Sequence, residues 1–278
     1  MSLVLFTCLV GLVIAPNSPD FFSSTLSLFA VSLGAGAAGT LNMWYESDLD
    51  ALMSRTCLRP IPKGKIKKNQ ALLFGIFLSI VSISLLYYSS NLISAILLFT
   101  TISFYFFVYT IWLKRKTPQN IVIGGAAGAL PPMIGWTIST GSISIEPTIL
   151  FLIIFLWTPS HFWALSLYKS EDYKKAKIPM LPLTSGPDKT KLNILAYSFL
   201  MMPPVFSIYY FKLGTIICTI FCSALTFYYI YLCYLLFKTK TVISRNSIAK
   251  KVFVYSIFYL FTIFLALLTD NIFTNING

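Results

Sequence analysis

Residues 21–50, FFSSTLSLFAVSLGAGAAGTLNMWYESDLD, decide the fold. Residues 21–40 carry no charge, and a helix that crosses the hydrocarbon core of a membrane needs about 20 apolar residues. Three acids, Glu46, Asp48 and Asp50, follow almost at once. The stretch therefore predicts a membrane-spanning helix that leads into a dense group of carboxylates.

The composition of the whole chain favours an integral membrane protein. Of its 278 residues, 56% are hydrophobic and only 11% are charged, with a mean hydropathy of +0.77. A soluble domain carries roughly a quarter charged residues. The net charge of +12 would favour a nucleic-acid partner in a soluble protein. Here we expect the bilayer and no nucleic acid, because the basic residues are distributed as in membrane proteins.

We predict an all-α polytopic membrane protein with about nine transmembrane helices in a single domain, residues 1–278. The apolar runs are continuous, whereas a transmembrane barrel needs short alternating strands. The expected spans are residues 2–15, 22–42, 70–89, 91–112, 119–138, 147–167, 194–211, 214–237 and 250–269.

The distribution of basic residues tests this topology. Of the 21 Lys and Arg residues, 20 fall in alternate loops and only Lys212 lies on the other side. The positive-inside rule places the basic loops in the cytoplasm. An odd number of spans then predicts a cytoplasmic N-terminus and a periplasmic C-terminus. We interpret residues 2–15 as a true first helix rather than a signal peptide, because no basic segment precedes the apolar run.

The polar residues after the second span suggest a metal site. Asn42, Glu46 and Asp50 are four residues apart, which places them on one helix face, while Asp48 projects from another face. Stacked carboxylates repel one another without a cation, and oxygen ligands of this kind suit Mg²⁺ with a phosphate. The alternative is a solvated helix end at the membrane surface. We favour the metal, because three of the nine acids of the chain fall here.

Two further loops repeat this mixture of charges. Arg55 and Arg59 follow the first acids and are suited to phosphate oxygens, although flanking charge alone would also explain them. The segment YKSEDYKKAKIPMLP (168–182) places Glu171 and Asp172 beside lysines. The shorter loop contributes Lys114 and Arg115. We therefore predict a diphosphate clamp formed by several loops at one membrane face.

Two apolar spans contain unusual residues. His161 in LWTPSHFWAL (156–165) is the only histidine of the chain. An ionisable residue inside the membrane is a functional candidate, so we expect it to bind iron or orient a ring, with a purely structural imidazole as the alternative. The segment GGAAGALPPMIGW (124–136) predicts close helix packing and a break at its proline pair, rather than a phosphate loop.

These motifs together resemble one family. NMWYESDLDALMSRTCLRP (42–60) resembles the first Asp-rich motif, N-x-x-x-D-x-x-x-D, of the intramembrane (UbiA-type) prenyltransferases. The strings YTIWLKRKTPQNIVIGGAAGALPPMIGW (109–136), LWTPSHFWAL and EDYKKAKIPMLP (171–182) resemble the branch of that family that farnesylates haem, in a bacterial form. The resemblance covers nearly all of residues 1–190, and these long strings make it specific.

The resemblance implies a helical bundle around a central cavity and a reaction. Farnesyl diphosphate, haem B and water would give haem O and diphosphate, with Mg²⁺ assisting ionisation to an allylic cation. It also implies a place in haem O and haem A biosynthesis in the bacterial inner (plasma) membrane, with a haem A synthase or a terminal oxidase assembly as a candidate partner.

The resemblance also assigns roles to residues of this chain. The implied catalytic residues are Asn42, Glu46, Asp48, Asp50 and Asp172, the implied metal ligands are Asn42, Glu46, Asp50 and Asp172, the implied diphosphate-binding residues are Arg55, Arg59, Lys114, Arg115 and Tyr109, and the implied haem-binding residue is His161.

Two departures from the family pattern matter. Glu46 replaces the usual Asp, and Ala176 stands four residues after Asp172, where relatives that act on quinones carry a second Asp. The second departure favours haem over a quinone or chlorophyll-type ring, which remains the nearest alternative. A cation-coupled transporter is the alternative from another class, although transporters place their ionisable groups near the bilayer midplane.

Overall fold

The computed structural model describes residues 2–17, 19–54 and 56–277, and the described secondary structure is helical. The chain forms two compact units. Unit 1 comprises Met1–Ser142 and Glu171–Pro179, and unit 2 comprises Ile143–Ser170 and Met180–Gly278.

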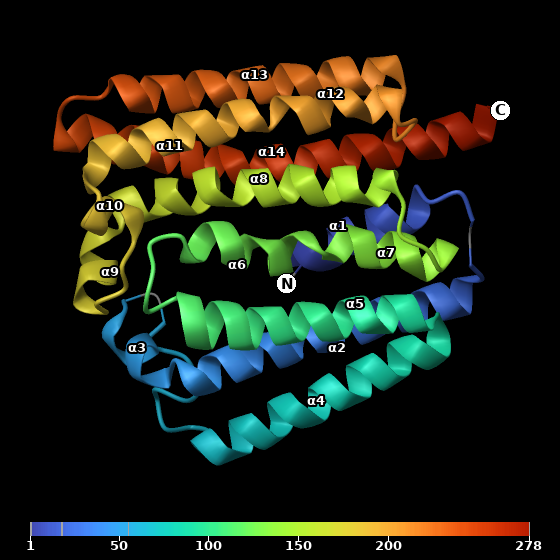
Figure 1. The fold of residues 1–278 in the computed structure, drawn as a ribbon, viewed down its shortest axis with the longest axis horizontal. Helices are drawn as coiled ribbons and strands as arrows, with labels where there is room; N and C mark the ends of the chain where they lie inside the picture. The colour runs from blue at the N-terminus through green and yellow to red at the C-terminus, as the bar shows by residue number, and fades with distance from the viewer. Residues whose placement is uncertain (1, 18, 55, 278) are drawn as a thin grey trace. The chain divides into compact units, whose positions relative to one another are not determined.

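Unit 1 contains most of the shorter helices (Figure 1). Its elements are α1 (Ser2–Val13), α2 (Phe21–Tyr45), α3 (Ser47–Leu52), α4 (Lys68–Ser89), α5 (Leu92–Ser103), the π-helix η1 (Phe104–Leu113), α6 (Asn120–Ala129), α7 (Pro131–Thr140) and most of α9 (Ser170–Lys175). The elements of unit 2 are α8 (Ile145–Tyr168), α10 (Leu181–Thr184), α11 (Gly186–Leu200), α12 (Met202–Tyr210), α13 (Ile216–Lys238) and α14 (Val242–Asn277).

Most of the predicted spans are present as long apolar helices. Within the described residues, eight helical segments are long and apolar enough to cross a membrane, and α1 is a shorter apolar helix. The 12 residues of α1 extend about 18 Å, whereas the hydrocarbon core is about 30 Å thick. The fold class is as predicted. The first span, however, is shorter than a crossing helix over its described length.

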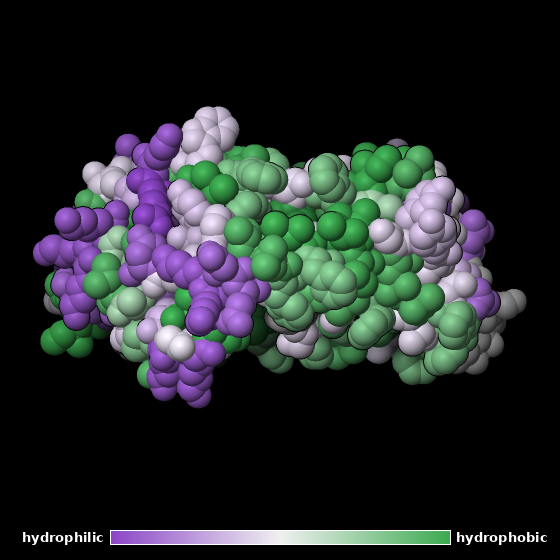
Figure 2. Space-filling view, turned by 90° about the horizontal axis from the view of Figure 1, so that it is seen from below, coloured by the Kyte–Doolittle hydropathy of each residue, from purple (hydrophilic) through white to green (hydrophobic). Residues whose placement is uncertain are grey.

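The surface of unit 1 is that of a membrane protein. Helix α4 exposes a row of large apolar side chains, including Leu73, Phe74, Phe77 and Ile80. Figure 2, which views the side where α4 lies, shows hydrophobic residues across the middle and hydrophilic residues gathered toward one end. Such a broad exposed apolar surface is stable only against lipid or another apolar partner.

Small residues allow the helices of unit 1 to approach closely. Helix α1 packs on α7, and a Cβ added at Gly11 would lie 2.1 Å from the carbonyl oxygen of Pro132. A Cβ added at Gly135 would lie 1.9 Å from the carbonyl oxygen of Cys8. Backbones in such contact leave no space for a side chain, which confirms the prediction of close packing around residues 124–136.

Helix breaks position the polar residues of the chain. The predicted span 119–138 divides into α6 and α7 at Pro131 and Pro132, because proline lacks the N–H group that a helix interior requires. Pro159, in contrast, lies inside the uninterrupted helix α8. The span predicted over 91–112 changes from α5 to the π-helix η1 at Phe104.

In unit 2, α8 packs against both α11 and α14, and α13 also packs against these two helices (Figure 1). The largest fully buried side chains here are Trp163, Tyr229, Tyr259 and Phe264. Predicted spans 194–211 and 250–269 begin eight residues early in the structure, at Gly186 and Val242. Hydropathy marks the apolar part of a helix, whereas these helices continue through charged turns.

Candidate active site

The end of α2 and the start of α3 bury the predicted acidic face. The Glu46 amide donates to the Asn42 carbonyl over 2.9 Å, and the Asp50 amide donates to the Glu46 carbonyl over 2.8 Å. This helical spacing confirms that the three residues share a face, and their exposed fractions are only 6%, 1% and 4% for Asn42, Glu46 and Asp50. Asp48 projects elsewhere, as predicted, with 55% of its side chain exposed.

The three acids Glu46, Asp48 and Asp50 each have a basic partner. Lys114 forms an ion pair with Glu46. Nη1 of Arg59 donates to both oxygens of Asp50 over 2.8 and 2.9 Å. Two guanidinium nitrogens of Arg115 donate to the two oxygens of Asp48 over 2.9 and 3.0 Å. We define the acid–base cluster by its members, which are Asn42, Glu46, Asp48, Asp50, Arg59, Lys114 and Arg115.

The π-helix η1 carries Lys114 into this cluster. The Lys114 amide donates to the Tyr109 carbonyl, five residues earlier, over 2.9 Å. The Thr110 hydroxyl donates to the Tyr105 carbonyl over 2.8 Å and accepts from the Asn42 side chain over 3.1 Å. Short π-helical segments occur frequently at functional sites. Sequence reasoning missed Thr110, although it lies beside Tyr109 in the recognised string.

Aromatic rings flank two of the bases. The Lys114 ammonium lies 5.5 Å from the ring centroid of Tyr109, and the Arg115 guanidinium carbon lies 5.2 Å from that of Tyr45. The rings of Tyr105 and Tyr109 are 5.3 Å apart. Cations over aromatic faces are attracted to the ring quadrupole, so these rings hold the two bases in place.

The exposed ion pair of Asp48 and Arg115 has shifted pKa values. Partial burial raises the pKa of Asp48, but the hydrogen bonds and charge of Arg115 outweigh it, so the pKa of Asp48 lies below its ordinary value. The hydrogen bonds with Asp48 in turn raise the pKa of Arg115. Both groups are therefore charged at neutral pH.

The second predicted loop lies against the first. The Ser54 hydroxyl, just beyond α3, donates to the Asp172 carboxylate over 2.7 Å. Asp172 belongs to α9 and to unit 1, so the structure brings these two loops together. Sequence reasoning did not identify Ser54. The predicted diphosphate ligand Arg55 lies outside the described residues.

The donor set is suited to a hard cation. Oε1 of Glu46 is buried without a hydrogen-bond partner among the described residues, so one carboxylate oxygen has unused acceptor capacity. Within the described residues, no three Asp, Glu, Cys or His side chains converge as a metal site, because Glu46, Asp48 and Asp50 turn toward separate bases. Mg²⁺ needs only one or two protein carboxylates alongside water and phosphate oxygens, so the residues fit a metal that arrives with a diphosphate.

His161 lies in unit 2, on α8. Its ring stacks on Trp157 with centroids 4.2 Å apart and on Phe253 with centroids 4.7 Å apart. Its Nδ1 lies 2.6 Å from the hydroxyl oxygen of Ser256 on α14. The residue is thus part of a packed aromatic site, and its exposed fraction is 7%.

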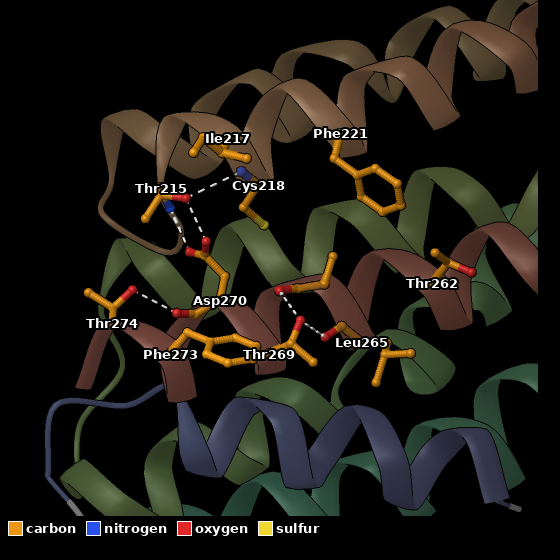
Figure 3. Close-up of a pocket in the computed structure, with 11 residues that line it drawn as sticks. Thr215, Ile217, Cys218, Phe221, Thr262, Leu265, Thr269, Asp270, Phe273 and Thr274 are labelled. Carbon is orange, nitrogen blue, oxygen red and sulfur yellow. Dashed lines mark hydrogen bonds between the residues drawn. The ribbon is translucent and has the colours of Figure 1, made fainter. Parts of the chain in front are cut away.

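A large groove of unit 2 lies farther along α14 (Figure 3). Its volume is about 780 Å³, and Asp270 is the acid in its lining. Both carboxylate oxygens of Asp270 already accept from Thr215, over 2.5 and 2.7 Å. Asp270 follows Ser256 by 14 residues, or about 21 Å of helix. We therefore assign no chemistry to this groove.

Comparison with known proteins agrees with the recognised motifs. The model of the UbiA prenyltransferase family matches residues 4–257. The chain is 62% identical to a protein of Pelagibacter ubique named protoheme IX farnesyltransferase, over 98% of this chain and 90% of that protein. A protein of the same name from Parvibaculum lavamentivorans is 47% identical, over 97% of this chain and 85% of that protein.

Solved structures share the fold. A digeranylgeranylglyceryl phosphate synthase has a TM-score of 0.79 at 23% identity, covering 97% of this chain and 93% of that one. A UbiA homologue from Archaeoglobus fulgidus, bound to DMAPP and Mg²⁺, has a TM-score of 0.69 at 16% identity, covering 96% of both chains. These likenesses confirm the predicted fold class, and the family match confirms the predicted enzyme class: the chain belongs to the UbiA prenyltransferase family.

Proposed function

We propose that the protein transfers the farnesyl group of farnesyl diphosphate to a vinyl group of haem B. Water adds in the same reaction, and the products are haem O and diphosphate. The observation that carries the proposal is the acid–base cluster, with Glu46 and Asp50 buried, in a chain that is 62% identical to a protein named protoheme IX farnesyltransferase.

The bases of the cluster stabilise the leaving diphosphate. Arg59, Lys114 and Arg115 carry the positive charge that a departing diphosphate requires. In the structure each is neutralised by an acid of this chain, so the pairs exchange partners when substrate enters. The bases turn to phosphate oxygens, which would leave the carboxylates of Glu46 and Asp50 available to hold a metal.

A bound Mg²⁺ supplies positive charge at the phosphate oxygens and so lowers the barrier to ionisation. Asn42, Glu46, Asp50 and Asp172 are the residues that would hold it. Support comes from the unpartnered Oε1 of Glu46 and from the Archaeoglobus fulgidus homologue that binds DMAPP and Mg²⁺. Tyr105 and Tyr109 flank the cluster with aromatic faces suited to the allylic cation. The vinyl group then forms a C–C bond to that cation, which leaves a cation on the haem side chain. Water adds to this second cation and loses a proton, which gives the hydroxyl group of the product.

His161 is the proposed contact to haem. Neutral imidazole is a common axial ligand of haem iron, and stacking on Trp157 and Phe253 surrounds this imidazole with the flat apolar surfaces that a porphyrin also prefers. Both substrates are apolar over most of their surface, so they reach a buried site from the bilayer.

The setting follows from the charge pattern. We propose a bacterial inner membrane location with the basic loops in the cytoplasm and the C-terminus in the periplasm. The expected cytoplasmic N-terminus requires the first helix to cross, and α1 is short for this over its described residues. A haem A synthase or a terminal oxidase assembly is the proposed partner, because it would consume the apolar product.

A reconstituted reaction tests the function. Purified protein in detergent is incubated with haem B, farnesyl diphosphate and Mg²⁺, and the pigments are separated by chromatography. We expect a more hydrophobic haem whose formation requires both the diphosphate and the metal. If a quinone precursor is prenylated while haem B is not, the haem proposal is wrong although the family remains. If neither acceptor reacts, the proposed activity is wrong.

A further inference from the structure

The hydrogen bonds around Ser256 specify the protonation of His161. The Ser256 hydroxyl donates to the Phe253 carbonyl, one turn earlier on α14, over 2.6 Å. A serine hydroxyl has one proton. With that proton on the Phe253 carbonyl, the oxygen accepts from Nδ1 of His161, at 2.6 Å. In this arrangement Nδ1 carries a hydrogen.

The second ring nitrogen is then an acceptor. The rings that sandwich His161 belong to Trp157 and Phe253, and burying an unpaired charge in such surroundings is costly. A neutral imidazole has one N–H group. Because Nδ1 holds that hydrogen, Nε2 presents its lone pair.

The same residue also fixes the position of the ring. The indole Nε1 of Trp157 donates to the Ser256 carbonyl over 2.8 Å, so the backbone and the side chain of Ser256 hold Trp157 and His161, respectively. Ser256, Trp157 and His161 are buried, and the exposed fraction of Ser256 is 0%. Rotation of the imidazole would lose the Ser256 bond and the stacking together.

We infer that Ser256 is a positioning residue that holds His161 as the Nδ1–H tautomer, leaving Nε2 to bind the iron of haem B. The role at iron rests on the proposed function, whereas the tautomer does not. Histidines that bind metals commonly donate their other ring N–H to a fixed partner, which sets ring orientation and basicity.

Nitrogen NMR tests the tautomer without haem. Because the chain has one histidine, selective ¹⁵N-histidine labelling gives a single pair of imidazole resonances. We expect a protonated Nδ1 and an unprotonated Nε2 in the wild-type protein, and loss of this preference in Ser256→Ala. A wild-type spectrum with the proton on Nε2, or with both nitrogens protonated, would overturn the inference without any variant.

Haem titration tests the consequence. Ferric haem B is added to the wild type, His161→Ala, Ser256→Ala and Ser256→Thr, with absorption and electron paramagnetic resonance as readouts. We expect Ser256→Ala to weaken iron ligation by about tenfold to a hundredfold, and Ser256→Thr to restore it because the hydroxyl is retained. Ser166→Ala is the matched control, since that buried serine donates to the Trp163 carbonyl of its own helix.

The outcomes separate the two proposals. If His161→Ala binds haem with the wild-type spectrum, the assigned ligand is wrong and the iron role of Ser256 falls with it, while farnesyl transfer is decided by the product assay. If His161→Ala changes the spectrum and Ser256→Ala does not, only the positioning role is overturned. Equal losses of iron ligation in Ser166→Ala and Ser256→Ala would show that the loss comes from disturbed packing, and this result would also overturn the positioning role of Ser256.

Discussion

Glu46 and Asp50 of the acid–base cluster in unit 1 and His161 in unit 2 are all buried, but their polar atoms are satisfied in opposite ways. In the cluster, Glu46 and Asp50 are paired with Lys114 and Arg59. Around His161 the partners are three aromatic rings, two of them stacked and one edge-on, and a serine hydroxyl. The first region stores charge that can be redistributed to a charged ligand. The second holds a neutral ring in a fixed place.

This contrast predicts different costs of mutation. Removing one partner of a buried ion pair leaves the other charge buried without a partner. This loss destabilises the fold by more than the intact pair stabilises it. Removing a ring contact from a neutral site instead loses packing and orientation. The two regions should therefore respond to different variants and be detected by different assays.

Asp50→Asn should have the largest effect on turnover. The change keeps the shape of the side chain but removes a carboxylate charge that we propose holds Mg²⁺, so we expect kcat for farnesyl transfer to fall by roughly 100-fold to 1000-fold. Product formation at saturating substrates measures it. Asp188→Asn is the control, because that carboxylate also pairs with a base, Lys191, but is 91% exposed and lies outside the cluster. Equal turnover in Asp50→Asn and the wild type would remove Asp50 from the site.

His161→Ala should weaken haem binding and leave the binding of farnesyl diphosphate nearly unchanged. We expect haem affinity to fall by at least about tenfold, because an iron ligand and its stack on Trp157 are lost. Binding of farnesyl diphosphate, measured by calorimetry, should stay within about twofold of the wild type, since the acid–base cluster is unchanged. Parallel loss of both affinities would show that the two regions do not act separately.

Two glycines of α6, Gly124 and Gly128, allow a matched comparison, and we expect its effect on stability to be of intermediate size. A Cβ added at Gly124 would lie 2.2 Å from the ring of Tyr109, whereas nothing lies within 4 Å of one added at Gly128. We expect Gly124→Ala to displace that ring and lower stability by about 1–3 kcal/mol, with a raised KM for farnesyl diphosphate. Gly128→Ala should be neutral or stabilising by up to about 1 kcal/mol. Thermal melting and kinetics measure both, and similar behaviour of the two variants would contradict the contact.

The sequence predicted what hydropathy and spacing determine. Apolar runs of about 20 residues located the spans, the four-residue spacing located the buried face of Asn42, Glu46 and Asp50, and the proline pair located the break between α6 and α7. Each of these features is local in the chain. Helix boundaries at Gly186 and Val242 were missed because helices extend beyond their apolar part.

The pairings within the site were not predictable in this way. Whether Glu46 meets Lys114 depends on the π-helix η1, which changes the direction of the side chains without changing hydropathy. The contact between Ser54 and Asp172 joins residues 118 positions apart. Serine and threonine carry no signal of such partners, so Ser54, Thr110 and Ser256 could be found only from the structure.

The exposed pair of the cluster should show the smallest effect. Because the folded pKa of Asp48 lies below its ordinary value, the pair stabilises the fold above the ordinary Asp pKa of about 4, and this contribution is lost as pH falls through the lowered folded pKa. Exposed pairs contribute at most about 1 kcal/mol and are screened by salt. Thermal melting between about pH 6 and pH 2 should therefore show a slightly steeper acid loss of stability in the wild type than in Asp48→Asn. Identical profiles would mean that the pair of Asp48 and Arg115 leaves the stability of the fold unchanged, which would contradict this prediction.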